Sequence, residues 1–191
     1  KGNVIRLLDL LDEAVRRART IVDEKSPDLS DEERAEVAES VGAGALRYAD
    51  LSQNPQSNVT FDWDRMLSME GNTAPYLMYS YARCRSIQRK AGAAGQVDGL
   101  VLEGPFERAL AMHLLRFGDA VASATNAYRP NLLCDYLYET ANIFNRFYRE
   151  VPVLKADTDA QRISRLALVE STARILGHGF DMLGIRPLDR M

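Results

Sequence analysis

Apolar residues recur every three to four positions along most of this chain, which is the spacing of one face of an α-helix. The clearest stripe lies between about Arg6 and Glu24, where seven residues fall on one face: Leu7, Leu8, Leu11, Ala14, Val15, Ala18 and Val22. No segment shows the alternation of apolar and polar residues that marks a half-buried strand. The pattern therefore predicts an all-α fold.

Capping signals predict where the first helices begin and end. Ser30 and Glu33 have the spacing of a capping box, in which each side chain bonds the other residue's backbone N–H. They predict the start of a second helix that runs towards Tyr48. Turn-forming residues over 52–62 predict a loop, and a short helix is expected after it, over about 63–69.

The rest of the chain, from Gly71 onward, is expected to form a four-helix unit. Thr73 and Pro75 suit the first turn of a helix that ends in the glycine-rich stretch 92–104. Three further helices are expected to span about Pro105 to Asn126, Pro130 to Arg149, and Thr158 to Leu183, with Gly184 ending the last one. Their packing faces include Leu110, Leu114, Phe117 and Val121.

The composition is that of an ordinary globular domain, with 46% apolar and 27% charged residues among 191. The net charge of −3 gives no global positive field that would attract nucleic acid. A local basic cluster without any acid is nevertheless present: Arg83, Arg85, Arg89 and Lys90. No apolar run approaches the ~20 residues that a membrane span needs. We therefore expect neither a DNA partner nor a membrane partner.

The side chains that usually carry catalysis are scarce. His113 lies among apolar residues and is expected to be a satisfied core or groove histidine, and His178 has no acidic partner one turn earlier. Gly42-Ala43-Gly44 resembles the start of a dinucleotide-binding fingerprint but lacks the third glycine and a preceding strand. Cys84 and Cys134 are expected to be buried free thiols of a reducing compartment. The chain contains no recognisable active site and no metal-ligand motif.

A more unusual segment is 75–87, in which three tyrosines and two arginines fall within ten residues. Tyr76, Tyr79 and Arg83 are spaced by three and four positions, so they share one helix face. Aromatic rings beside guanidinium groups suit unstacked RNA bases, because the rings stack on bases while arginine binds phosphates or base edges. This face is a candidate RNA-binding site.

A second aromatic and basic segment spans 144–149. Phe144 and Phe147 are expected in the core, whereas Tyr148 stands near a helix end and suits either core or surface. The residues alone leave three alternatives open: RNA binding, a protein-interaction module that uses the tyrosine-rich face as a groove, and a stand-alone structural bundle. Salt distinguishes RNA from an apolar partner, because phosphate contacts make affinity fall steeply as salt rises.

Five stretches resemble the C-terminal part of bacterial-type arginyl-tRNA synthetases, which are class I enzymes. In chain order they are ALRYADLSQN at 45–54, FDWDRMLS at 61–68, EGNTAPYL at 70–77, RCRSI at 83–87 and LGIRPLDRM at 183–191. The resemblance covers essentially the whole chain. It implies a helical connecting segment over residues 1–70 and a helical-bundle anticodon-binding domain of the DALR type over residues 71–191.

The resemblance also implies a function. Members of this family attach arginine to its tRNA with ATP and Mg²⁺, through an arginyl-adenylate, and generally need the tRNA for amino-acid activation. Lys1–Val4 resemble the residues that follow the second ATP-binding signature of class I synthetases. We therefore expect the nucleotide-binding domain upstream, and no aminoacylation by this chain alone. Arginine tRNA is the implied partner, and the full-length enzyme is expected to be a cytoplasmic monomer.

The resemblance implies RNA contacts at four positions. Tyr79 and Arg83 match the aromatic and basic residues of the family's tyrosine-rich helix, and Tyr148 matches a helix-end tyrosine near the anticodon. Met191 matches a C-terminal residue that contacts the anticodon loop. The basic cluster adds two expected phosphate contacts, which are Arg85 and Arg89. No catalytic residue is expected in this chain.

Overall fold

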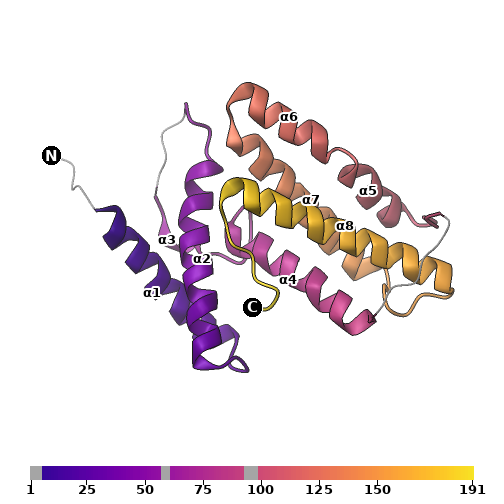
Figure 1. Cartoon of the computed structure of the whole chain (residues 1–191), viewed down its shortest axis with the longest axis horizontal. Coiled ribbons are helices and arrows are strands. Elements are labelled where there is room, and N and C mark those ends of the chain that lie inside the picture. The colour runs from indigo at the N-terminus through magenta and orange to yellow at the C-terminus, as the bar shows by residue number, and fades with distance from the viewer. Residues whose placement is uncertain (1–5, 57–60, 93–98) are drawn as a thin grey trace.

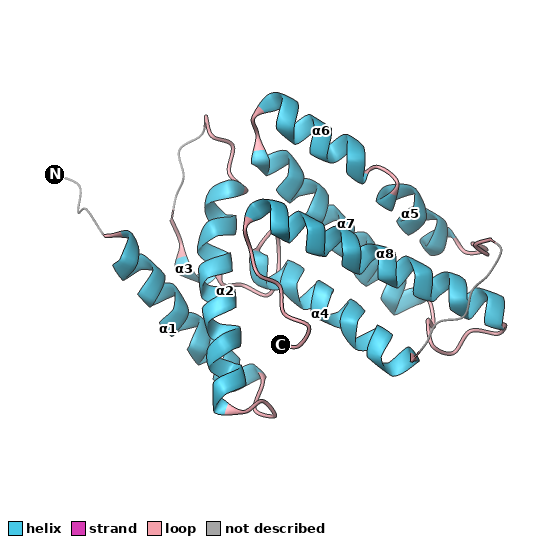
Figure 2. Cartoon of the chain, viewed as in Figure 1, coloured by secondary structure: helices cyan, strands magenta, loops and turns pink. Residues whose placement is uncertain are grey.

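The computed structural model describes residues 6–56, 61–92 and 99–191. Every regular element within these ranges is a helix, as Figure 2 shows, so the all-α prediction is confirmed. The elements are α1 (Leu7–Lys25), α2 (Asp31–Leu51), α3 (Trp63–Met66), α4 (Ala74–Ala91), α5 (Pro105–Leu114), α6 (Phe117–Ala127), α7 (Pro130–Glu150) and α8 (Asp159–Leu183). The resemblance at Lys1–Val4 lies outside the described residues, as do parts of the loops expected at 52–62 and 92–104. No described helix is both long and apolar enough to cross a membrane.

The helices α1 and α2 pack against each other as a hairpin at one end of the molecule (Figure 1). The capping box predicted at the start of α2 is present, with Ser30 and Glu33 bonding each other's backbone N–H. Gly42 lets the two backbones approach closely, since a Cβ at this position would lie 2.7 Å from the Cα of Val15. The apolar stripe of α1 is buried only in its later turns, and Leu7 remains 67% exposed.

A bundle of longer helices forms the rest of the molecule. In Figure 1, α7 lies behind α8, with α4 on one side and α5 and α6 on the other. The larger of two core clusters joins this bundle to the hairpin, because it contains Val37 and Tyr48 of α2 together with Leu77 and Met78 of α4. Hydrophobic packing is therefore continuous across the region of Gly71.

The helix predicted from Pro105 to Asn126 is in fact two helices. The helix is interrupted after α5 by a tighter turn, in which the Arg116 N–H donates to the His113 carbonyl at 3.0 Å. A new helix, α6, then starts at Phe117. The physical reason is that the two halves bury their apolar residues in different places. Leu110 and Leu114 belong to the smaller core cluster, whereas Phe117, Val121 and Ala124 pack in the larger one. The described residues from Gly71 onward thus form five helices rather than four.

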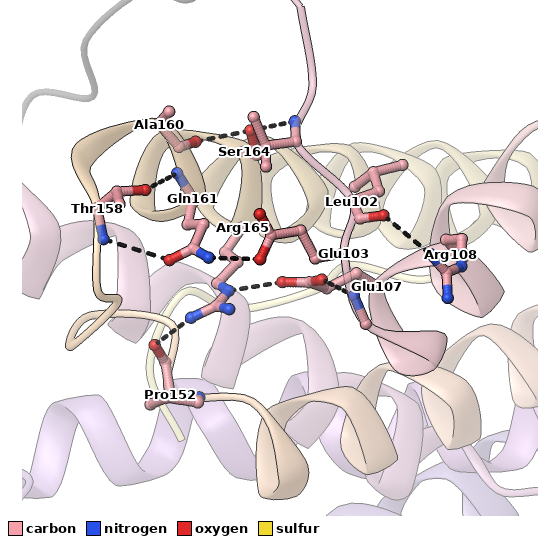
Figure 3. A network of polar contacts seen from close by, with 12 residues as sticks. Leu102, Glu103, Glu107, Arg108, Pro152, Thr158, Ala160, Gln161, Ser164 and Arg165 are labelled. Carbon is pink, nitrogen blue, oxygen red and sulfur yellow. Dashed lines mark hydrogen bonds and ion pairs between the residues drawn. The ribbon is translucent and has the colours of Figure 1, made fainter.

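A buried ion pair links α5 to α8 (Figure 3). The Arg165 guanidinium of α8 donates to Glu107 of α5, with Nε 2.6 Å from Oε1, and both side chains are at least 89% buried. Glu107 also accepts the Gly104 N–H at 2.6 Å, and Arg165 reaches the Pro152 carbonyl. Burial acts to raise the pKa of Glu107, but the Gly104 and Arg165 hydrogen bonds outweigh it and hold this pKa below the ordinary value.

We expect Gly42→Ala to lower the free energy of unfolding by about 1–3 kcal/mol, because the added methyl group must push apart the backbones of α1 and α2. Gly118→Ala in α6 is the matched control, since a Cβ there meets nothing within 4 Å. The control should raise stability by about 0.5–1 kcal/mol through helix propensity. Urea unfolding followed by circular dichroism measures both, and equal effects at the two glycines would contradict the close approach.

We expect Glu107→Gln to cost about 3–5 kcal/mol of unfolding free energy, because it leaves the buried Arg165 charge without its partner. The same change at Glu103, which is exposed and bonds Gln161, should cost less than about 1 kcal/mol. Because the folded-state pKa of Glu107 is depressed, its contribution is full at neutral pH and is lost as the pH falls through that pKa. Unfolding measured from neutral to acidic pH should show a larger loss of stability in the wild type than in Glu107→Gln.

Candidate RNA-binding surface

The packing of α4 against α7 brings together three of the predicted site residues. The guanidinium carbon of Arg83 lies 4.7 Å from the ring centroid of Tyr79, on the same helix, and 5.1 Å from that of Tyr148 on α7. We call Tyr79, Arg83 and Tyr148 the tyrosine–arginine surface. Such a cation–π contact is worth about 0.5–1 kcal/mol at an exposed site and more when desolvated, and Arg83 is half-buried.

Hydrogen bonds fix the arginine between the two rings. Arg83 Nη1 donates to Asn145 Oδ1 of α7 at 2.5 Å. The Asn145 amide in turn donates to the Tyr76 hydroxyl at 3.0 Å and to the Ser80 hydroxyl at 2.9 Å. Asn145 therefore uses both ends of its amide, and its side chain holds Arg83 in one orientation. The Tyr76 hydroxyl in turn donates to Asn142 Oδ1 at 2.9 Å, which extends the network along α7.

The rings remain available to a ligand. Tyr79 and Tyr148 are each 42% exposed, although both contact the guanidinium of Arg83. Tyr148 also stacks on the buried Phe144, with ring centroids 6.3 Å apart, which ties it to the core. An aromatic ring that packs on the core with one face and is open to solvent on the other can stack with an unstacked base.

The structure places Arg85 and Arg89 on another side of α4. Arg85 forms an ion pair with Asp189 at 3.1 Å, and Arg89 donates to the Asp189 carbonyl at 3.1 Å. This pairing raises the pKa of Arg85. Met191 is partly buried and packs against the larger core cluster. Arg85 and Arg89 thus hold the last residues of the chain and do not join the tyrosine–arginine surface.

The last residues run from the end of α8 between α2 and α4 (Figure 1). Gly184 ends α8 in the left-handed conformation, with φ of 65°, as expected for a helix C-terminus. The segment is tied to α2 as well, because Arg47 donates to the Gly184 carbonyl and Ser40 donates to the Arg186 carbonyl. An Arg186–Glu36 ion pair adds to these contacts.

Sequence reasoning missed the asparagines of this site and one cleft. Asn142, Asn145 and Tyr148 are spaced by three positions, and this repeat on one helix face was the available signal. The cleft, of about 690 Å³, lies between α1, α2 and residues 61–74. It has a mixed lining that includes Leu7, Phe61, Arg47 and Asn72.

The remaining polar candidates have structural surroundings. His113 Nε2 lies 2.9 Å from the Thr140 hydroxyl and its ring stacks on Tyr136 at 4.5 Å, so the histidine is satisfied, as expected. Burial lowers the pKa of His113. Both cysteines are free and buried, and burial raises the pKa of the Cys134 thiol to about 12. Within the described ranges, no group of three or more histidine, cysteine or acidic residues could hold a metal ion.

Comparison with family models defines the class of this protein. Residues 77–191 match the model "DALR anticodon binding domain", and residues 1–63 match "tRNA synthetases class I (R), catalytic domain". The second model is that of class I tRNA synthetases. The chain belongs to the DALR anticodon-binding family and corresponds to the helical C-terminal part of arginyl-tRNA synthetases.

Individual relatives agree with this assignment. The arginine–tRNA ligases of Chloroflexus aurantiacus and Fusobacterium nucleatum are 51% and 46% identical to the whole chain. The chain spans about a third of the length of these relatives, 34% in each case. The arginyl-tRNA synthetase structure from Thermus thermophilus matches with a TM-score of 0.94 and 39% identity, over all of this chain and 33% of that one. The Plasmodium falciparum enzyme matches with a TM-score of 0.86 and 28% identity, over 98% of this chain and 34% of that one.

We expect Arg85→Ala and Asp189→Ala each to lower the free energy of unfolding by about 0.2–1 kcal/mol, as for other partly exposed ion pairs. Because both changes remove the same contact, the double variant should be little worse than either single one. Asp189→Ala combined with Arg16→Ala is the control, since Arg16 pairs with Glu13 on α1, outside this network, and its effect should add. Additive effects of Arg85→Ala and Asp189→Ala in urea unfolding would contradict the pairing.

Proposed function

We propose that this chain is the tRNA-recognition part of an arginine–tRNA ligase and that its tyrosine–arginine surface binds the anticodon loop of arginine tRNA. The observation that carries the proposal is the position of Arg83, held between the rings of Tyr79 and Tyr148 while both rings stay 42% exposed. Bases in an anticodon loop are single-stranded and can leave their own stack. Stacking on such rings stabilises a bound base by about 1–3 kcal/mol.

The full-length enzyme would join L-arginine to its tRNA with ATP and Mg²⁺, and it would act in the cytoplasm as a monomer. The chain spans about a third of the length of its relatives, and only residues 1–63 match the class I catalytic-domain model. We therefore assign ATP and Mg²⁺ to a nucleotide-binding domain beyond this chain and derive no chemical step from the residues present. The chain alone is proposed to be inactive in aminoacylation.

Three of the six proposed tRNA contacts form one surface, and the other three have a different setting. Tyr79, Arg83 and Tyr148 are proposed to meet the bases of the loop. Arg85 and Arg89 are engaged by Asp189, so any contribution from them would pass through the placement of the C-terminal residues. Met191, packed beside the core, is proposed to contact the loop from that segment.

We expect Arg83→Ala to weaken binding of an arginine tRNA transcript by about 1–3 kcal/mol, or roughly 5–150-fold. The wild type should also prefer this transcript over one whose middle anticodon base is changed. The measurement is a titration of both transcripts at two salt concentrations, with Arg174→Ala on α8 as the control that keeps wild-type affinity.

Equal affinity of the wild type and Arg83→Ala for arginine tRNA would remove Arg83 from the site. A partner that binds this surface with little salt dependence would instead favour the protein-interaction module, because phosphate contacts make affinity depend on salt.

A further inference from the structure

The last two turns of α7 carry two arginines that are not part of the tyrosine–arginine surface. Arg146 and Arg149 are both exposed, and they flank Tyr148 in the sequence. Within the described ranges, neither guanidinium forms an ion pair or a side-chain hydrogen bond. Most other exposed arginines differ in this respect. Arg16 and Arg174, for example, are each paired with a glutamate on their own helix.

The helical repeat places these arginines beside the tyrosine–arginine surface. Residues advance by about 100° each around an α-helix. Going around α7 from Tyr148, Asn145 follows at about 60°, Arg149 at about 100° and Arg146 at about 160°. Within these last two turns of α7 the one acidic residue is Glu150, at about 200°. We call Tyr148, Asn145, Arg149 and Arg146 the arginine strip.

Contacts at both edges confirm the direction of the strip. At one edge Tyr148 faces α4, because the Arg83 guanidinium lies over its ring. At the other edge Arg146 faces α5, with its guanidinium carbon 5.1 Å from the ring centroid of Phe106. The strip therefore crosses the outer side of α7 from α4 to α5. Its α4 edge is the Tyr148 ring, which is open for stacking. Towards α5 it carries two positive charges that have no carboxylate partner among the described residues.

We infer that the arginine strip binds the phosphates of the RNA strand whose bases lie on the tyrosine–arginine surface. The inference rests on the proposed function and extends it. RNA carries one phosphate for each base, so a strand with a base stacked on Tyr148 must continue over a neighbouring part of the protein. The strip offers positive charge on the α5 side of that ring. Phosphate contacts set position and affinity without reading the sequence, so Arg146 and Arg149 act on all tRNAs alike.

The test is the salt dependence of tRNA binding by the 191-residue chain. Each neutralised phosphate on a single strand contributes about 0.7 to the slope of log affinity against log salt. Arg146→Ala/Arg149→Ala should therefore make the slope shallower by about 1.4, twice that value, and should weaken arginine tRNA and the anticodon-changed transcript by the same factor. Arg146→Lys/Arg149→Lys keeps the charge and should keep the wild-type slope.

The matched control is Arg16→Ala/Arg174→Ala, which removes two exposed charges that lie on α1 and α8 and are already paired. It changes the net charge by the same amount and should leave the slope unchanged. Circular dichroism establishes that each variant is folded.

The outcomes separate this inference from the proposed function. If the wild type prefers its anticodon but the slope of Arg146→Ala/Arg149→Ala is unchanged, the phosphate role is overturned and the proposed function stands. A loss of anticodon preference with an unchanged slope would also overturn it, since the arginines would then read bases. If the wild-type chain shows no binding of arginine tRNA, both proposals fail for this chain.

Discussion

The mutual packing of α4, α7 and α8 sets the positions of the other helices and of the tyrosine–arginine surface. Each of these helices contributes to both core clusters, so none can slide along another without disturbing the two at once. The fit between α7 and α8 is close, since a Cβ on Gly179 would lie 2.4 Å from a methyl carbon of Leu137. This packing fixes the register of α4 against α7, and the register brings Arg83 of one helix over Tyr148 of the other.

Local chemistry made most helix starts predictable. The capping boxes at Ser30 and Thr158 and the cap at Thr73 all depend on residues three positions apart, which a sequence shows directly. Tyr79 and Arg83 also lie one turn apart on a single helix, so their contact could be expected from spacing alone. The division at residue 71 and the RNA contacts themselves stay predictions.

Contacts between distant segments account for what the sequence did not reveal. The interruption between α5 and α6 arises because the apolar residues of the two helices pack into different core clusters. Arg85 and Arg89 share a basic run with Arg83, but their partner Asp189 lies a hundred residues away in the chain. Asn145 is an ordinary polar residue in sequence, and it has a role only because Arg83, Tyr76 and Ser80 meet it from α4.

In the RNA complex that we propose, the fixed orientation of Arg83 affects the rate of association. A free arginine side chain has about 2 kcal/mol of rotamer entropy, which a mobile residue would lose when RNA arrives. Here Asn145 and the two tyrosine rings already restrict the side chain, so most of that loss accompanies folding. The protein side of the encounter then needs little rearrangement. The association rate would be governed by how often the RNA loop opens its own bases, while the lifetime of the complex reports the strength of the stacking.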